Sequence, residues 1–238
     1  MAEVLADSPL GYWKMDEAVG ATTAVDSSGN GQDATYTGAT VTTGERQLLG
    51  DYSGSGAAAR FVSAGRAEIA AAVWHEMSGS FTYECWHRRV TDPAASTFPG
   101  IFRRGATGAG GAVLYYNSGR DITYNRDGTG RVSSLVGAQV NSADLGRAQH
   151  IVLRYDLAAT KLALFLNGSE LATWRTVTDT FAAPVSAVLQ IGGDSGAAGN
   201  DQWVDEVALY GTALPDARVL AHYQAGISSP PPNRLNLR

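Results

Sequence analysis

The chain of 238 residues contains a single cysteine, Cys85, and charged residues make up only 17% of its sequence. One cysteine excludes an internal disulfide and any cysteine-based metal site. The formal net charge of −5 lacks the basic excess that proteins carry when they bind nucleic acid or anionic membranes. We therefore expect neither nucleic acid nor a membrane among the partners of this protein.

Long hydrophobic runs and a targeting segment are missing as well. No stretch approaches the roughly 18 apolar residues that a membrane-spanning helix needs. Residues 1–7 contain neither the basic start nor the apolar stretch of a secretory signal peptide. The sequence thus predicts a protein that is made in the cytoplasm without being secreted through a signal peptide.

Motifs of common catalytic sites are also absent. The sequence has no Gly-x-Ser-x-Gly elbow of a hydrolase. His75-Glu76 is not followed by the second histidine of a His-Glu-x-x-His zinc motif. Cys85 occurs in an alternating apolar pattern, which indicates a small core side chain rather than a nucleophile. We therefore expect no enzymatic activity.

What the chain does have is many turn residues between short β-prone segments. It contains 28 glycines, and its strongest candidate strands are 80–88, 150–155, 161–166 and 203–210. Asn167-Gly168 predicts a type I′ hairpin turn. A short helix is expected to begin at Pro215 and to end near Gly226. About a dozen short strands and one late helix predict an all-β sandwich of two antiparallel sheets.

Several motifs occur together in an order that is specific in combination. They are Tyr12-Trp13, the loop from Asp26 to Gly31, Phe81 to Trp86, His150 to Asp156, Leu164 to Gly168 and Val204 to Tyr210. With these motifs the chain resembles the concanavalin A-like, laminin-G-like jelly-roll family over roughly residues 8–226. Cys85 and His87 depart from the pattern, which usually has small or β-branched apolar residues there.

The resemblance implies two curved antiparallel sheets and a binding module for glycans or proteins, often with a structural Ca²⁺. Laminarinase-type relatives carry a Glu-x-Asp-x-x-Glu strand with the carboxylates of a glycosidase. This triplet occurs nowhere in the chain, and Asp205-Glu206 are adjacent, so that they are expected on opposite faces of a strand. The resemblance therefore favours binding over hydrolysis.

Both ends of the chain are interpreted as arms. We expect an N-terminal arm at 1–9, one jelly-roll domain at 10–226 and an extended, proline-rich arm at 227–238. Arms of this kind suit a subunit of an assembly. A single laminin-G-like chain with such arms and no signal peptide looks like a bacteriophage virion protein, by analogy with the family.

The acidic loop after the first strand is the best candidate for calcium. Ca²⁺ takes about 6–8 oxygen ligands, and a glycine-rich acidic loop supplies carboxylates and carbonyls. The predicted ligands are Asp26 and Asn30, joined by Asp205 from the last strand and by Glu17. The alternative is that Asp26 and Asn30 form Asx turns and that Asp205 caps a neighbouring loop.

Ligand recognition is expected on the concave sheet and its rim loops. Trp86, Arg88 and Tyr116 are the candidates, because aromatic faces stack on sugar rings while arginine binds hydroxyls or carboxylates. The alternative is that these side chains pack in the sandwich.

The sequence therefore predicts a non-enzymatic binding module on the surface of a phage particle. In one hypothesis it is an adhesin for glycans of the host cell surface. In the other it is a structural subunit, a capsid decoration or tail protein, whose arms bind other virion proteins or further copies of itself.

Overall fold

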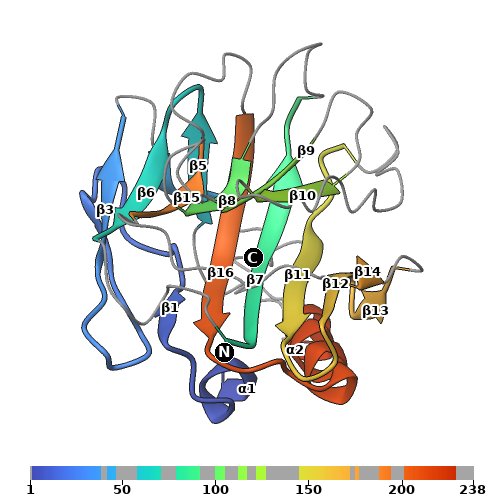
Figure 1. Ribbon diagram of the computed structural model, residues 1–238. Helices are drawn as coiled ribbons and strands as arrows, with labels where there is room; N and C mark the ends of the chain where they lie inside the picture. Colours follow the sequence, from blue (N-terminus) through green and yellow to red (C-terminus); the bar gives the residue numbers. More distant parts are fainter. Residues whose placement is uncertain are drawn as a thin grey trace, which may run out of the picture.

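The protein folds into two antiparallel β-sheets packed face to face (Figure 1). The computed structural model describes residues 2–38, 42–46, 58–70, 79–91, 100–104, 112–116, 122–126, 145–171, 175–176, 188–193 and 201–228. The all-β sandwich expected from the sequence is confirmed, and most of its predicted strands lie within one or two residues of the observed ones.

The larger sheet has nine strands within the described residues. Across the sheet they are β13 (Ser169–Glu170), β12 (Lys161–Leu166), β11 (Gln149–Asp156), β7 (Phe81–Arg89), β16 (Asp201–Tyr210), β5 (Ala58–Val62) and β4 (Thr42–Arg46). Two short strands extend it, because β1 (Gly11–Trp13) pairs with β16 and β14 (Arg175–Thr176) pairs with β12.

The smaller sheet has seven strands in the same part of the chain. They are, in order, β10 (Ile122–Arg126), β9 (Ala112–Tyr116), β8 (Gly100–Arg104), β15 (Leu189–Gly192), β6 (Arg66–Ile69), β3 (Ala34–Thr37) and β2 (Thr23–Ala24). The main core lies between the two sheets and draws large apolar side chains from both.

β7 shows that the larger sheet is buried on both of its faces. Tyr83 and Cys85 point into the core between the sheets, as their alternation predicts. Trp86 belongs to a separate cluster on the outer face, and all nine residues of β7 are buried. Something must therefore cover the outer face of this sheet.

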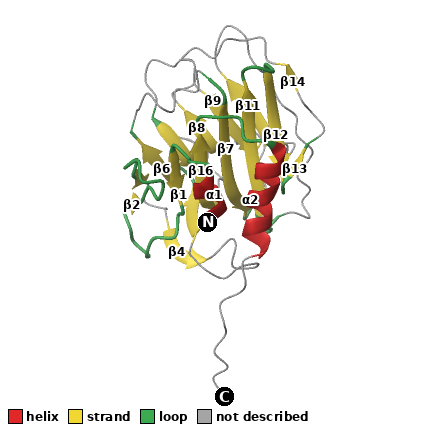
Figure 2. Cartoon of the chain, turned by 90° about the horizontal axis from the view of Figure 1, so that it is seen from below, coloured by secondary structure: helices red, strands yellow, loops and turns green. Residues whose placement is uncertain are grey.

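Part of this cover is formed by two helices, α1 (Ala2–Ala6) and α2 (Asp216–Ser228), which lie on one side of the sheet (Figure 2). Val4 of α1 and Val219 of α2 are buried in one cluster with Phe165 and Tyr210 of the strands beneath them. The prediction of an N-terminal arm is thus wrong for residues 2–6. Burying the apolar side chain of Val4 against the sheet has a more favourable free energy than leaving it in water.

The late helix is confirmed, but it is longer than expected. It begins directly after Pro215 and continues through Gly226 to Ser228. The remainder of the predicted C-terminal arm, residues 229–238, lies outside the described part of the chain. Neither helix of the described chain is long and apolar enough to cross a membrane.

The last strand, β16, contains a β-bulge that explains its imperfect alternation. Its register against β7 shifts between Asp205 and Ala208, and Glu206 has a positive φ of 50°. Because one extra residue is inserted there, Val204 and Val207 both face the core although they are three residues apart.

Candidate functional site

The predicted calcium loop is closed by its own hydrogen bonds. Oδ1 of Asp26 accepts hydrogen bonds from the backbone N–H groups of Tyr12 and Ser28, at 3.0 and 2.9 Å. Oδ2 accepts from the Ser28 hydroxyl at 2.8 Å and from the Gln32 N–H at 2.9 Å. Burial by itself would raise the pKa of Asp26, but these hydrogen bonds outweigh it and lower the pKa. The carboxylate is therefore ionised and already neutralised by four donors.

The other predicted ligands are held by different partners. Glu17 accepts hydrogen bonds from Val25 N–H and from the Tyr36 hydroxyl. Asn30 donates through Nδ2 to the carbonyls of Pro9 and Leu10.

Asp205 is buried in β16, next to Glu206. Burial, followed by the negative charge of Glu206, raises its pKa well above the ordinary value, which favours the protonated acid. Among the described residues no three His, Cys, Asp or Glu side chains are grouped closely enough to hold a metal ion. The described structure does not assemble the predicted residues into a calcium site, because Asp26, Asp205 and Glu17 do not form such a group and the Asp26 and Glu17 carboxylates already accept hydrogen bonds.

The three predicted ligand-binding residues do not share one open surface. Tyr116 is fully buried between the sheets, where its hydroxyl lies 3.1 Å from Nδ1 of His87. Burial lowers the pKa of His87 to about 4, so this interior histidine is neutral near pH 7. Arg88 and Trp86 lie on the outer face of the larger sheet and are 3% and 1% exposed. Of the three, Trp86 belongs to the lining of the pocket described below, and Arg88 and Tyr116 do not.

A buried polar network beneath the helices fixes α2 on the sheet. Nδ1 of His222 lies 3.0 Å from both carboxylate oxygens of Glu84, and Nε2 lies 2.8 Å from Oδ2 of Asp7. The Tyr210 hydroxyl donates to Glu84 at 2.6 Å, and Nε2 of His150 lies 3.4 Å from the same carboxylate. These groups are enclosed by the two helices and the sheet, so we assign them a structural role.

Charge explains why this network tolerates burial. Burial by itself would raise the pKa of Glu84, but the hydrogen bonds and positive charge of His150 and His222 lower it to about 2. Burial would likewise lower the pKa of His222, yet Glu84 and Asp7 raise it above the ordinary value. The structure therefore buries an ion pair whose members have hydrogen-bond partners, the condition under which buried charges are stable.

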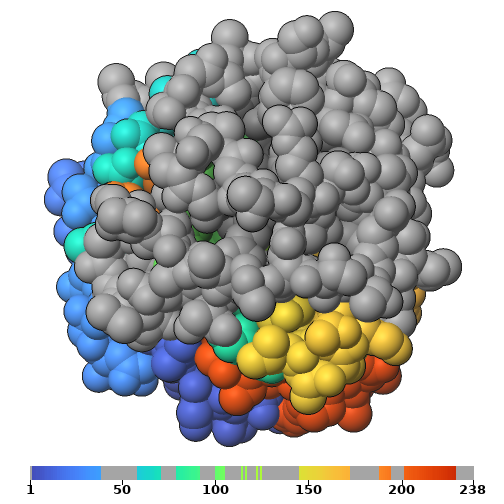
Figure 3. Space-filling model, in the orientation of Figure 1, coloured from blue at the N-terminus to red at the C-terminus, as the bar shows by residue number. Residues whose placement is uncertain are grey.

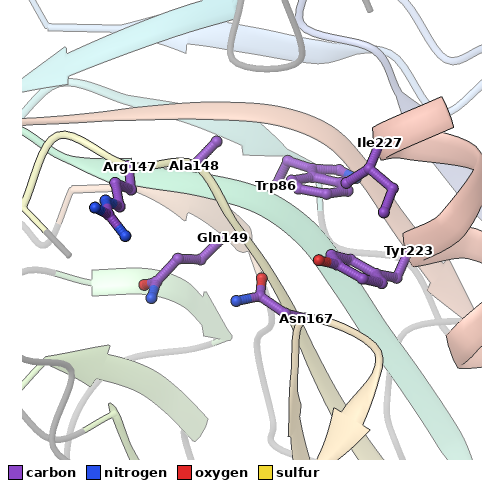
Figure 4. A pocket seen from close by; sticks show the side chains of 7 residues that line it. All are labelled: Trp86, Arg147, Ala148, Gln149, Asn167, Tyr223 and Ile227. Atoms are coloured by element: carbon purple, nitrogen blue, oxygen red, sulfur yellow. The ribbon is translucent and has the colours of Figure 1, made fainter. Parts of the chain in front are cut away.

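A pocket of about 120 Å³ opens at the rim of the larger sheet (Figure 4). Arg147, Ala148 and Gln149 lie on one side of it, and Trp86, Tyr223 and Ile227 lie opposite, with Asn167 between the two groups. These residues come from β7, the start of β11, the β12–β13 turn and the last turns of α2. The surfaces of β11–β13 and α2 adjoin in the space-filling view (Figure 3, yellow and red).

The β12–β13 turn places Asn167 at the pocket. Asn167 and Gly168 both have positive φ values, 52° and 77°, so the predicted type I′ turn is confirmed. Oδ1 of Asn167 accepts a hydrogen bond from the backbone N–H of His150 at 3.0 Å. A Cβ at Gly168 would lie 2.9 Å from Cδ1 of Tyr223, so this glycine lets α2 approach the turn.

Close packing also orients the aromatic wall of the pocket. The rings of Trp86 and Tyr223 are stacked, with centroids 5.8 Å apart and an interplanar angle of 20°. Gly226 permits this arrangement, because a Cβ there would lie 2.3 Å from Cζ2 of Trp86. Tyr223 is only partly buried, so part of this side chain remains in contact with solvent at the pocket.

Chemically, the pocket combines aromatic carbon with hydrogen-bonding groups. Two amide side chains and one guanidinium are set against the Tyr223 ring, the composition by which small polar ligands are held and oriented. The lining contains no Asp, Glu, Ser or Cys side chain. The sequence analysis predicted Trp86 as a ligand-binding residue and Asn167 only as a turn residue. It gave no sign that four further residues belong to a binding site, because only tertiary packing brings them together: Arg147, Gln149, Tyr223 and Ile227.

Comparison with solved structures shows the same fold in proteins of low sequence identity. A receptor-binding domain superposes with a TM-score of 0.72 at 12% identity, covering 94% of this chain and 52% of that one. The binding domain of botulinum neurotoxin serotype D gives 0.69 at 12% identity, covering 92% and 52%. A Trypanosoma rangeli sialidase gives 0.66 at 18% identity, covering 94% and 33%. The chain thus spans about a third to a half of these proteins.

Sequence comparison adds the family. No curated protein matches the chain. A family model described as the concanavalin A-like lectin/glucanases superfamily matches residues 63–220, more than half of the chain. The chain belongs to the concanavalin A-like lectin/glucanases superfamily.

Proposed function

We propose that this protein is a non-enzymatic carbohydrate-binding module and that the rim pocket is its binding site. The observation that carries the proposal is the placement of the partly exposed side chain of Tyr223 opposite the polar side chains of Gln149 and Arg147 (Figure 4). A sugar ring has an apolar C–H face and a rim of hydroxyls, which matches such a pair of walls. The lectin-like fold family supports the same class of ligand.

The size of the pocket sets the expected affinity. A volume of about 120 Å³ accommodates part of a glycan, such as one terminal ring. A monosaccharide has about 12 non-hydrogen atoms, and about 0.3 kcal/mol for each gives roughly 4 kcal/mol, or a Kd of about 1 mM. Strong attachment to a cell would then require several copies acting together.

Binding without hydrolysis is supported by the pocket lining. Most glycosidases flank the scissile bond with a pair of carboxylates, and the pocket lining contains none. Incubating the protein with each bound glycan and separating the products by chromatography tests this point. Intact glycan is the expected result, and release of a shorter sugar would overturn the non-enzymatic part of the proposal.

The site itself is tested with a glycan array followed by titration of the bound sugars. Tyr223→Ala should weaken binding about threefold to tenfold, the effect of losing an aromatic contact of about 0.5–1.5 kcal/mol. Asn167→Gly removes an amide from the pocket but keeps a residue that tolerates the positive φ of this turn. Leu157→Ala, at an exposed position outside the pocket, serves as the control. Equal affinity in all four proteins would place the site elsewhere.

The setting we propose is the surface of a bacteriophage particle, where the module attaches the virion to a host-cell glycan. The structural similarity to a receptor-binding domain and to the binding domain of a neurotoxin supports a role at cell surfaces. The alternative of a structural subunit held by two arms loses support, because residues 2–6 pack on their own sheet. Labelled protein should bind intact bacterial cells saturably; a lack of binding to any cell wall preparation would contradict this setting.

A further inference from the structure

Arg147 stands out among the arginines of the described chain. Arg60, Arg154 and Arg218 each form an ion pair with an aspartate, at 2.8, 2.5 and 2.7 Å. Arg147 is exposed at the pocket and forms neither an ion pair nor a hydrogen bond within the described residues. In a protein with a net charge of −5, a positive charge at a pocket whose described lining holds no carboxylate is a distinctive feature.

The other polar groups of the pocket also present hydrogen-bond donors. Oδ1 of Asn167 is taken by the His150 N–H, which leaves its Nδ2 as the available part of the amide. The indole Nε1 of Trp86 is buried and faces Gly226 of α2, where a Cβ would lie 3.0 Å from it, so it is not offered to a ligand. The amide of Gln149 can donate or accept a hydrogen bond. The pocket therefore favours a ligand with more acceptors than donors.

The arrangement of charge and apolar surface is directional. Arg147 lies across the pocket from Tyr223 and Ile227, as the close view shows (Figure 4). A ligand that complements both walls has an anionic group at one end and a C–H face at the other. A guanidinium recognises a carboxylate through two parallel N–H···O bonds, which a hydroxymethyl group cannot accept.

We propose that the pocket selects an acidic sugar, with the carboxylate bound by Arg147 and the ring face lying on Tyr223. This inference rests on the proposed carbohydrate-binding function and specifies its ligand class. A sugar such as a hexuronic acid differs from its neutral parent only in a carboxylate that replaces a hydroxymethyl group.

Matched pairs of methyl glycosides test the inference by titration. The probes are methyl glucuronide with methyl glucoside, and methyl galacturonide with methyl galactoside, each followed by NMR at millimolar concentration. We expect the acidic member of at least one pair to bind ten times more tightly or better. Because Arg147 is exposed, this preference should shrink as the salt concentration rises.

Two variants test whether Arg147 causes the preference for the acidic sugar over the neutral one. Arg147→Gln keeps hydrogen-bonding capacity and removes the charge, so the ratio of acidic to neutral affinity should fall to about one, whatever the change in binding of the neutral sugar itself. Lys14→Gln removes one positive charge outside the pocket lining and should leave the preference unchanged.

The possible failures are distinguishable. If acidic and neutral sugars bind equally well, or if Arg147→Gln retains the tenfold preference, this inference is wrong while carbohydrate binding stands. If neither member of any pair binds to the wild-type protein, carbohydrate binding at the pocket is overturned together with the inference.

Discussion

At the scale of single residues, the missing Cβ of Gly226 sets how closely α2 approaches the larger sheet. The Trp86 indole fills the space that this Cβ would need. Glycine in a helix normally costs up to about 1 kcal/mol relative to alanine, so local propensity alone would favour the substitution. The tertiary contact therefore predicts that alanine at position 226 destabilises the protein, whereas helix propensity predicts that it stabilises it.

Gly226→Ala should therefore destabilise the protein by about 1 to 3 kcal/mol, the range for overpacking a tight core. The new Cβ would lie 2.3 Å from Cζ2 and 2.7 Å from Cε2 of Trp86, so the helix end must shift. Urea denaturation measures the change. Gly79→Ala, with no atom within 4 Å of the new Cβ, is the control. A more stable Gly226→Ala variant would show that the helix end can move freely.

Asp26 stabilises the folded protein through the hydrogen bonds that its carboxylate accepts. Asp26→Ala leaves the backbone N–H donors of Tyr12, Ser28 and Gln32 without their acceptor, and we expect a loss of about 2 to 3 kcal/mol. A calcium chelator should leave the melting temperature of the wild-type protein unchanged, because the Asp26 carboxylate already accepts four hydrogen bonds. A chelator-dependent drop in Tm that disappears in the variant would restore the calcium hypothesis.

At the scale of elements, α2 links the sheet, the N-terminal helix and the pocket. Its buried side holds Val219 and His222, and its exposed Arg218 binds Asp7 and Glu3 of the N-terminal segment. Exposed ion pairs contribute about 0–1 kcal/mol, so the buried contacts decide the position of α2. The same helix carries Tyr223 to the pocket, and the buried network thereby positions the proposed binding site.

His222 should give the stability of this element a defined pH dependence. Its pKa is raised in the folded protein, so its contribution is fully present below the ordinary pKa of about 6.5 and is lost as the pH rises through the folded value. Removing one partner of a buried pair costs about 3 to 5 kcal/mol. We therefore expect His222→Gln to differ most from wild type at pH 5 to 6, with a difference that shrinks toward pH 9.

Chemical denaturation of both proteins across this pH range measures the effect. Gln224→Ala, an exposed change on the same helix, controls for effects of helix propensity. A wild-type minus His222→Gln difference that stays constant with pH would show that the histidine is not protonated in the fold.

At the scale of the whole molecule, one core joins the two sheets. The main cluster takes Tyr83 and Leu153 from the larger sheet and Phe102 and Ile191 from the smaller one. The centroids of the Tyr83 and Phe102 rings are 4.2 Å apart across the interface. Neither sheet can keep its inner face buried when the other unfolds.

Thermal unfolding should consequently be a single cooperative transition. The calorimetric and van't Hoff enthalpies should agree, as they do for a two-state domain. Far-UV circular dichroism and tryptophan fluorescence should report the same midpoint. Two separate transitions would mean that the helical cover or one sheet unfolds independently of the rest.

Much of the fold was predictable because it depends on local patterns. Alternation in β7 assigned Tyr83 and Cys85 to the core face, and Asn167-Gly168 specified a type I′ turn. Both features follow from the backbone: successive side chains of a strand point to opposite faces, and this turn needs two positive φ values. The β-bulge at Glu206 was not predicted, because in the sequence it shows only as an irregular alternation of apolar and polar residues.

Most of the candidate site was not predictable, because period-two alternation tells which side chains share a face but not what covers that face. The tertiary structure buried Arg88 on the outer face of the larger sheet and placed Tyr116 inside the sandwich. It supplied the donors that occupy Asp26 from Tyr12 and from Gln32. The sequence by itself determined the strands, the turn and the late helix. Only the tertiary structure decided the pocket. Its walls come from segments up to about 140 residues apart, which meet because α2 packs on the larger sheet.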